Sequence, residues 1–353
     1  MKMRWRRRWF LTSLILLGSG LLQIRPEFPV SQTEATPASK RGQKSVASGA
    51  DRQKRGSGIS FRQEPGRIDI LIDGKPFTSY HYQGFNKPIF LPVRAPNGAI
   101  VTRGYPIIPD IEGEAKDHPH QKGIWLTHGD VNGVDFWTEG MNTGRIIHRD
   151  FHILEASGES GILRSRNEWK APSGEILLKE MREVRILNRR QVRVMDFDFL
   201  LMAVNGPVKF GDTKEGTFGI RLAQAFSEKD GGLMENSFGG VGEKQCWGKR
   251  ADWVAYTATI GNEKLSVAIF DHSFSFRHPT YWHTRGYSLF AANPFGLHDF
   301  SNDRSKDGSF ILEKGKSLQL HYRLYLCPGS VKDARIAGEY RAYLEEVKLH
   351  SPQ

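Results

Sequence analysis

The chain has 353 residues, of which 39% are hydrophobic and 25% charged, a balance that is typical of globular proteins with a sizeable core. Its formal net charge is +11, but the surplus is unevenly placed. Residues 1–58 hold 12 Lys/Arg and 3 Asp/Glu, or +9, whereas residues 59–353 hold 38 and 36, or +2. A protein that binds nucleic acid needs a basic folded domain. Because residues 59–353 are nearly neutral, we expect no nucleic-acid partner.

Residues 1–23 have the layout of an export signal. A basic stretch, Lys2–Arg8, precedes an apolar run, Trp9–Leu22, which is short for a membrane span. The segment Arg7–Leu11 resembles a twin-arginine signal, with an ordinary signal peptide as the alternative. No clear cleavage site follows, so an uncleaved membrane anchor stays open. We expect an exported protein, either periplasmic or extracellular.

Residues 24–58 are rich in Ser, Gln, Thr, Ala, Pro, Lys, Arg and Gly and lack apolar periodicity. This composition predicts a disordered tether. The leader and tether should therefore be dispensable for folding, and a chain that begins near Ser60 should melt close to one that begins near Gln23. Residues 59–353 are expected to form a single domain.

Alternation with period two begins near Ile59 and predicts β-strands. Arg67–Ile72 alternates, Asp73 and Gly74 supply a tight turn, and Pro76–Tyr82 returns, which indicates a hairpin. Further strands are expected at 146–154, 161–169, 176–187, 191–199, 217–225, 254–259, 265–270, 287–292 and 318–326.

One helix is expected, from Val331 to about Val347, because apolar residues recur there at helical spacing. A dozen strands and one late helix predict an all-β fold, a large antiparallel β-sandwich whose sheets stack to bury their faces. The two cysteines, Cys246 and Cys327, lie in no CxxC motif, and two buried free thiols are at least as well favoured as a disulfide.

Two segments, residues 117–139 and 211–221, break the alternation and are dense in polar residues. Within Asp117–Glu139, an extended backbone would point His118 and His120 to one side, where they could share a metal or bracket a substrate hydroxyl. The alternative is that these histidines only form hydrogen bonds to the backbone that hold the loop together. Within Gly211–Arg221, Glu215 could act in proton transfer, or the segment could be a surface charge cluster.

A third such segment, residues 271–298, places His278 and His283 near Trp282. Aromatic faces beside hydrogen-bonding groups suit a sugar ring, whose C–H face stacks while its hydroxyls bond. The alternative is an aromatic cluster in the core, in which the histidines have hydrogen-bond partners. A fourth segment, Cys246–Trp253, adds cations and aromatic residues of the same kind.

Together these segments resemble a bacterial family of unknown function called PmoA-like, or methane oxygenase-like. The resemblance covers most of residues 67–327 and rests on HPHQKGIWLTHGDVNGVDFW, GDTKEGTFGIR, CWGKRADWV, FDHSFSFRHPTYWH and LFAANPFGLHDF. A membrane monooxygenase subunit would need several apolar spans, and the sequence after residue 23 has none. The family's strand pattern is similar to the supersandwich of galactose-mutarotase-like proteins, whose members act on sugars as epimerases, lyases or hydrolases, or bind them.

The leading hypothesis is therefore an exported carbohydrate-active enzyme that is a lyase, an epimerase or a hydrolase, acting on a carbohydrate or another polyhydroxylated small molecule. Acid, base and hydroxyl contacts would come from His118, His120, His128, Glu215, His278 and His283. Substrate contacts would come from Asp130, Asp212, Arg221, Trp247, Lys249, Arg250, Trp282 and Asn293. The histidine segments should then meet in space, with His120 and His283 on the same face of the domain.

Two alternatives stay open. The first is a metal-dependent enzyme in which His118, His120 and a carboxylate hold a divalent metal. The second is a non-catalytic carbohydrate-binding protein, which would keep the aromatic residues without acid–base groups.

Overall fold

The computed structural model describes residues 58–108 and 110–348. They belong to one compact unit, Gln53–Gln353. The expected export signal and nearly all of the expected tether, residues 1–57, lie outside the described residues. Among the helices that are described, none has the length and apolar character to cross a membrane.

Eight antiparallel strands form the first sheet. In order of pairing they are β1 (Ile59–Glu64), β2 (Arg67–Ile72), β3 (Lys75–His81), β4 (Ile89–Phe90), β5 (Ile124–His128), β11 (Gly216–Arg221), β16 (Leu289–Asn293) and β15 (Tyr281–Thr284).

The second sheet also has eight antiparallel strands. In order they are β12 (Leu233–Asn236), β13 (Trp253–Ile260), β14 (Glu263–Asp271), β18 (Ser317–Pro328), β9 (Val192–Ala203), β8 (Ile176–Arg189), β7 (Ser160–Lys170) and β6 (Arg145–Ser157). A small ribbon pairs β10 (Val208–Phe210) with β17 (Phe310–Leu312). The helices are η1 (Gln224–Phe226), η2 (Glu228–Asp230), α1 (Glu243–Cys246), α2 (Leu297–Ser301) and α3 (Ile336–Lys348).

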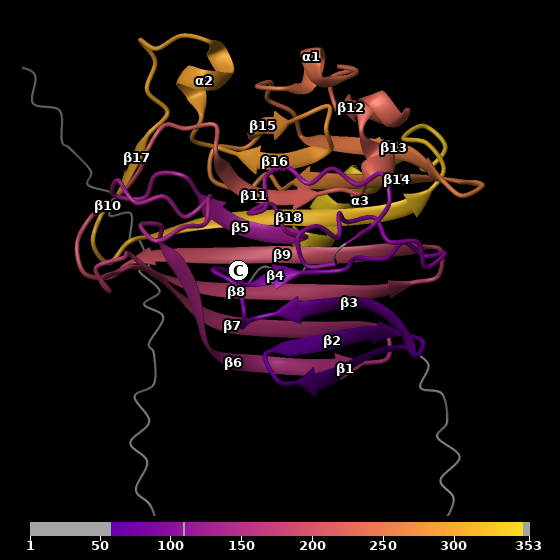
Figure 1. The fold of residues 1–353 in the computed structure, drawn as a ribbon, viewed down its shortest axis with the longest axis horizontal. Helices are drawn as coiled ribbons and strands as arrows, with labels where there is room; N and C mark the ends of the chain where they lie inside the picture. The colour runs from indigo at the N-terminus through magenta and orange to yellow at the C-terminus, as the bar shows by residue number, and fades with distance from the viewer. Residues whose placement is uncertain (1–57, 109, 349–353) are drawn as a thin grey trace, which may run out of the picture. The chain divides into compact units, whose positions relative to one another are not determined.

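The two sheets pack face to face, and the main core lies between them (Figure 1). Successive side chains of a strand point to opposite faces, so each strand contributes every second residue to this core. Phe218 of the first sheet stacks on Tyr322 of the second with ring centroids 4.9 Å apart, and it lies 4.8 Å from Phe197. The predicted all-β antiparallel sandwich is confirmed.

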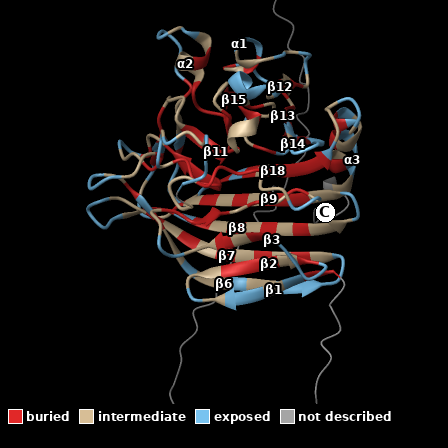
Figure 2. Ribbon diagram, turned by 45° about the vertical axis from the view of Figure 1, so that its right-hand side comes forward, coloured by how far each residue is buried: buried red, intermediate tan, exposed pale blue. Residues whose placement is uncertain are grey.

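Burial is uneven along the sheets, as Figure 2 shows, with exposed β1 at one edge and buried strands in the middle. Every residue of β5, β11 and β16 is buried, because loops cover the outer face of these strands while the second sheet covers the inner face. A strand that is buried on both faces loses the polar–apolar alternation. The sequence nevertheless predicted β11 and β16, within 217–225 and 287–292, whereas β5 and β15 were missed.

The C-terminal helix is confirmed, although it begins at Ile336 rather than Val331, since residues 331–335 form turns. Ile336, Tyr340 and Tyr343 pack on the outer face of the second sheet, where they form a separate core cluster. Cys327 lies in this cluster and Cys246 in the main core, and both thiols are free and buried. The short helices α1 and α2 were not expected.

Candidate functional site

Strand pairing brings three of the polar segments together on the outer face of the first sheet. Trp125 of β5 lies opposite Gly219 of β11, Gly219 lies opposite Ala291 of β16, and Ala291 lies opposite His283 of β15. The neighbours of these residues, such as Phe218 and Trp282, point into the main core. The row Trp125–Gly219–Ala291–His283 therefore faces away from the second sheet.

Small residues in this row leave room for large rings above the strands. A Cβ atom on Gly219 would lie 2.9 Å from Cζ2 of Trp125, so the indole rests directly on the backbone of β11. Trp137, from the loop after β5, lies over the row, with its ring 5.4 Å from Trp125 and 6.1 Å from His283. These rings form the buried floor of the candidate site.

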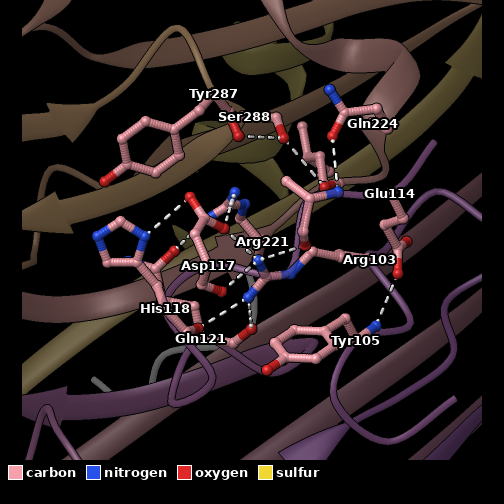
Figure 3. Close-up of polar contacts among 12 residues, drawn as sticks. Arg103, Tyr105, Glu114, Asp117, His118, Gln121, Arg221, Gln224, Tyr287 and Ser288 are labelled. Atoms are coloured by element: carbon pink, nitrogen blue, oxygen red, sulfur yellow. Dashed lines mark hydrogen bonds and ion pairs between the residues drawn. The ribbon is translucent and has the colours of Figure 1, made fainter. Parts of the chain in front are cut away.

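An aspartate–histidine pair lies at the centre of the polar part of the site (Figure 3). Nδ1 of His118 lies 2.9 Å from Oδ2 of Asp117. The other carboxylate oxygen, Oδ1, accepts hydrogen bonds from Arg103 at 2.6 Å and from Arg221 at 2.8 Å. Burial alone would raise the pKa of Asp117, but Arg221, His118 and Arg103 together hold it below its usual value. The carboxylate is thus ionised at neutral pH.

The two arginines also fix the loop that carries this pair. The Arg103 guanidinium donates to the backbone oxygens of Asp117 at 2.7 Å, His118 at 2.8 Å and Gln121 at 3.0 Å. Both arginine side chains are only 1% exposed, and burial, aided by the charge of Arg103, lowers the pKa of Arg221 to about 10. They therefore hold Asp117 in place and lie too deep to contact a substrate in this arrangement.

His118 is the exposed member of the group. Its side chain is 43% exposed, and its ring stacks on Tyr287 at 5.2 Å with an interplanar angle of 9°. Tyr287 in turn lies under the Arg221 guanidinium, 4.5 Å from its ring centroid. His118 has φ of 41°, in the left-handed region, so its backbone is not extended, which was the condition under which both histidines would point to one side. His120 nevertheless lies beside it, with ring centroids 5.8 Å apart.

His120 lies where the exposed pair meets the aromatic floor, with its ring 6.3 Å from Trp137. Burial, reinforced by the positive charges of Lys87 and His118, lowers the pKa of His120 to about 4. Nearby, Glu139 accepts a 2.9 Å bond from the buried Lys87 and pairs with Lys122. His120 is consequently a neutral imidazole at pH 7.

His283 is the third histidine of the site, and it is nearly inaccessible at 2% exposure. Burial, together with the charges of Lys214 and Arg285, lowers its pKa to about 3. Its Nδ1 has no hydrogen-bond partner among the described residues, and the same holds for Trp125 Nε1 beside the same floor. Buried polar atoms without partners are costly and mark places where water or a ligand group could bind.

The structure places His118, His120 and His283 around Trp137 and Tyr287, and these residues with Asp117 are called the His118 group. His120 and His283 thus lie on the same face as predicted, but His128 and His278 do not join them. Glu215 directly precedes β11, the strand that carries Gly219, and pairs with Lys214.

His128 lies elsewhere, in the interior. Its Nε2 bonds the Gly211 carbonyl oxygen at 2.8 Å, and its ring packs against Phe210 and Phe295, which stack on each other. Burial lowers its pKa to about 4. Asp130 lies in the following turn, where Oδ1 accepts the Gly133 N–H at 2.8 Å.

His278 is also separate from the His118 group. Its Nδ1 lies 2.9 Å from Asp271, and its Nε2 lies 3.6 Å from Asp252, at the end of the second sheet.

Trp282, expected as a stacking platform for a sugar, is fully buried in the main core. Its Nε1 donates to the Ala251 carbonyl oxygen at 2.9 Å. In β15, alternation sends His283 outward and therefore Trp282 inward. The expectation was wrong for this residue, and the tryptophans of the site are Trp125 and Trp137 in its floor.

Two further expected residues join loops to each other. Asp212 accepts the backbone N–H of His298 at 3.0 Å and pairs with that imidazole at 2.9 Å. Asn293 donates to the Thr213 carbonyl oxygen at 2.9 Å and accepts the Phe295 N–H.

The fourth segment forms a different surface. Trp247 packs on Phe300 with ring centroids 5.6 Å apart, and Lys249 is exposed. Arg250 donates to the Pro279 carbonyl oxygen at 2.7 Å. None of these contacts involves the His118 group.

Sequence reasoning missed Arg103, Tyr287 and Lys87. Arg103 is a lone arginine in a loop, and only its bond to Asp117 in the structure shows that it belongs to the site. Trp137 and Glu139 lay within a segment that was singled out, but nothing distinguished them there. In the part of the chain that the structure describes, no group of three or more His, Cys, Asp or Glu side chains is arranged to hold a metal ion.

The fold and site define a large antiparallel β-sandwich with a histidine–carboxylate group on one outer face. Residues 67–341 match the model of a family described as Family of unknown function (DUF6807). Because this match spans most of the sequence, the chain belongs to that family. The expected name, PmoA-like, is not the description that this family carries. No curated protein matches the sequence.

Several solved structures resemble the chain at low identity. An α-galactosidase of family GH36 from Geobacillus stearothermophilus has 11% identity and a TM-score of 0.38 over 77% of this chain, which spans only 41% of that protein. A galactose mutarotase-like protein from Lactobacillus casei has 8% identity and a TM-score of 0.32, covering 76% of this chain and 100% of that one. A galactose mutarotase-like protein from Clostridium acetobutylicum has 10% identity and a TM-score of 0.34, covering 77% and 99%.

Proposed function

We propose that this protein is an exported enzyme that transfers protons on a sugar or another polyhydroxylated small molecule, with His118 as the exposed proton-transfer group. One observation carries the proposal. His118 is the partly exposed imidazole of the site, and its Nδ1 is fixed by a carboxylate that two buried arginines hold in place. General acid–base catalysis requires an imidazole that is held in one orientation and that a substrate can reach.

The bond to Asp117 determines how His118 would work. A carboxylate accepts a hydrogen bond, so Nδ1 carries the proton and Nε2 is left as the proton acceptor. When Nε2 takes a proton from the substrate, the ring becomes an imidazolium, and the adjacent Asp117 stabilises that charge. Arg103 and Arg221 keep Asp117 ionised, so that it orients the ring without taking the proton itself.

His120 supplies the complementary role. It is neutral at pH 7, because burial and the neighbouring charges lower its pKa to about 4. A neutral imidazole can donate its N–H to a substrate oxygen on which negative charge develops. With the two rings 5.8 Å apart, one ligand group can contact both.

This arrangement favours lyase or epimerase chemistry over hydrolysis. Glycoside hydrolysis usually needs two carboxyl groups that flank the scissile bond. Asp117 is occupied by two arginines and His118, and Glu215 is paired with Lys214. Two imidazoles that remove and return a proton suit a reaction at a carbon next to a carbonyl group, or at the anomeric hydroxyl.

Export is part of the proposal and rests on the basic and apolar N-terminal residues. Fractionation of cells that produce the full chain checks it: we expect the protein outside the cytoplasm, and retention in the cytoplasm would contradict export.

The enzymatic proposal is tested by incubating the protein in D₂O with a panel of aldoses, ketoses, uronates and short oligosaccharides. Proton NMR then detects exchange of carbon-bound hydrogen and the formation of new products. His118→Ala should lower the rate at least about 100-fold, the lower end for losing a general acid or base. His152→Ala removes an exposed histidine of β6 and should leave the rate unchanged. Absence of any turnover across the panel, or full activity of His118→Ala, would refute the proposal.

A further inference from the structure

A second polar groove lies on the outer face of the second sheet, on the opposite side of the sandwich from the His118 group. It has a volume of about 730 Å³ and extends over β7, β8, β9 and β18, with α3 along one side. Neither the proposed function nor the family description accounts for it.

Strand register arranges the floor of this groove in two rows. In the first row, Arg164, Glu183, Asp198 and His321 lie opposite one another across four strands. Arg164 donates from Nε to Glu183 at 2.7 Å, and His321 Nδ1 lies 2.5 Å from Asp198. The row therefore presents donors and acceptors in fixed positions. Three inter-strand spacings of about 4.8 Å give it a length of roughly 14 Å, which is longer than one sugar ring.

The second row lies beside the first. Arg185 lies opposite Asp196, which lies opposite Arg323. Asp196 accepts two bonds from Arg323, at 2.6 and 2.8 Å, and Glu346 of α3 pairs with the same guanidinium at 2.8 Å. Paired charges with so many mutual bonds hold the floor rigid, which lowers the entropic cost of binding a ligand.

The charges of the groove balance. Four arginines and four acidic residues line it, so its formal charge is zero apart from His321. A polyanion such as nucleic acid needs a basic surface, and a polycation needs an acidic one. The groove instead suits a neutral ligand whose groups both donate and accept hydrogen bonds, and the hydroxyl group is the common group of that kind.

An exposed aromatic ring completes the groove. Phe274 lines it and is 53% exposed. Its ring packs on His272 at 4.8 Å. His272 is fully buried, and its Nε2 has no partner among the described residues. A flat apolar ring beside paired hydrogen-bonding groups fits the C–H face of a sugar.

From these features we infer that the groove binds a neutral oligosaccharide, with Phe274 stacking on one sugar and Asp198 and Arg185 bonding the hydroxyls of the next. The inference goes beyond the proposed function and does not depend on it, because no residue of the groove belongs to the His118 group. Binding here would hold the protein on a glycan whether or not the other face is catalytic.

Affinity electrophoresis of the full chain tests the inference, with gels that contain laminarin, xylan, glucomannan, dextran or maltodextrin. We expect at least one neutral glycan to retard the protein. Phe274→Ala should weaken the association constant at least about tenfold, and Asp198→Asn should weaken it several-fold. The matched control is Phe238→Ala, which removes a phenylalanine that is 67% exposed on another surface and should have no effect. His118→Ala should also bind normally.

Three results would overturn the inference. The first is the absence of retardation by every neutral glycan. The second is an equal loss of binding in Phe274→Ala and Phe238→Ala. The third is binding that disappears in His118→Ala but persists in Phe274→Ala, which would place all glycan binding at the other face. Loss of turnover in His118→Ala with retained retardation would instead support both sites independently.

Discussion

Asp117 shows how one carboxylate can organise a site. It is bonded to His118 and to two arginines that are 1% exposed. Without it, two guanidinium groups would remain buried and close together with no carboxylate between them. The bonds of Asp117 therefore contribute both to the stability of the fold and to the proposed chemistry. Substitutions of Asp117 and His118 can separate these two contributions.

We expect Asp117→Asn to lower the free energy of unfolding by roughly 2–4 kcal/mol, because the partly exposed carboxylate compensates two buried guanidinium charges that the amide would leave uncompensated. His118→Ala should cost about 1 kcal/mol or less, because this side chain is partly exposed. Urea unfolding of both variants measures the difference. Equal losses in the two variants would mean that the arginines do not depend on Asp117.

Two buried histidines should make stability depend on pH. Burial lowers the pKa of His128 to about 4 and of His283 to about 3, below the ordinary value near 6.5. As the pH falls below 6.5, the unfolded chain takes up protons at these positions before the folded protein does. The free energy of unfolding should then decrease by about 1.4 kcal/mol per pH unit for each histidine, until the folded-state pKa is reached.

Thermal unfolding at pH 7.5, 6.5, 5.5 and 4.5 checks this expectation. His128→Asn should reduce the slope of stability against pH, whereas His152→Gln, at an exposed position of β6, should leave it unchanged. A melting temperature that stays constant from pH 7.5 to 4.5 would contradict it.

At the scale of elements, β11 connects the strands that carry the site. It pairs with β5 on one side and β16 on the other, and both of its faces are covered. Gly219 is the position on β11 where the outer face must stay flat, since the Trp125 ring lies on it. Strand packing and site geometry are thus set by the same residue.

Gly219→Ala should destabilise the protein by roughly 1–3 kcal/mol, the usual cost of adding a methyl group to a close-packed interior. The new Cβ would lie 2.9 Å from Trp125 Cζ2, so the indole must shift and press on Trp137. Unfolding measurements and tryptophan fluorescence report the two effects. Gly206→Ala, where a Cβ would meet no heavy atom within 4 Å, is the control. A Gly219→Ala variant with unchanged stability and fluorescence would mean that this packing is loose.

At the scale of the whole molecule, the described residues, 58–108 and 110–348, belong to one compact unit. Its first strand is held at its start, because Gly58 N–H bonds Asp73 at 2.7 Å and Ile59 N–H bonds the Gly158 carbonyl oxygen at 2.8 Å. The start near Ser60 that the sequence suggested would remove these bonds and the buried Ile59 side chain.

A chain that begins at Gln53 should therefore melt within about 2 °C of the full chain, a margin that corresponds to roughly 1 kcal/mol in a domain of about 300 residues. A chain that begins at Phe61 should melt at a lower temperature, because it lacks Ile59 and its bonds. Differential scanning calorimetry of the three chains distinguishes the outcomes. A larger drop for the Gln53 chain would show that earlier residues stabilise the domain.

The sequence alone determined the elements whose pattern is local. Strands such as β7 and β8 follow from alternation because one face meets the core and the other is more exposed. Turn residues marked their ends, and the number of strands with one late helix predicted the sandwich. The polar segments also stood out, because they break the alternation where loops cover the first sheet.

Only the tertiary structure decided which of these polar residues meet. His283 and His278 are five residues apart, yet pairing of β15 with β16 places the first beside Trp137, while the second bonds Asp271. Arg103 joined the site through contacts with Asp117 and Arg221, which lie 14 and 118 positions further along the chain. Side-chain periodicity is a local property, so the sequence predicted strands and their faces. Strand pairing joins segments that are distant in the sequence, so only the tertiary structure determined which side chains lie next to each other.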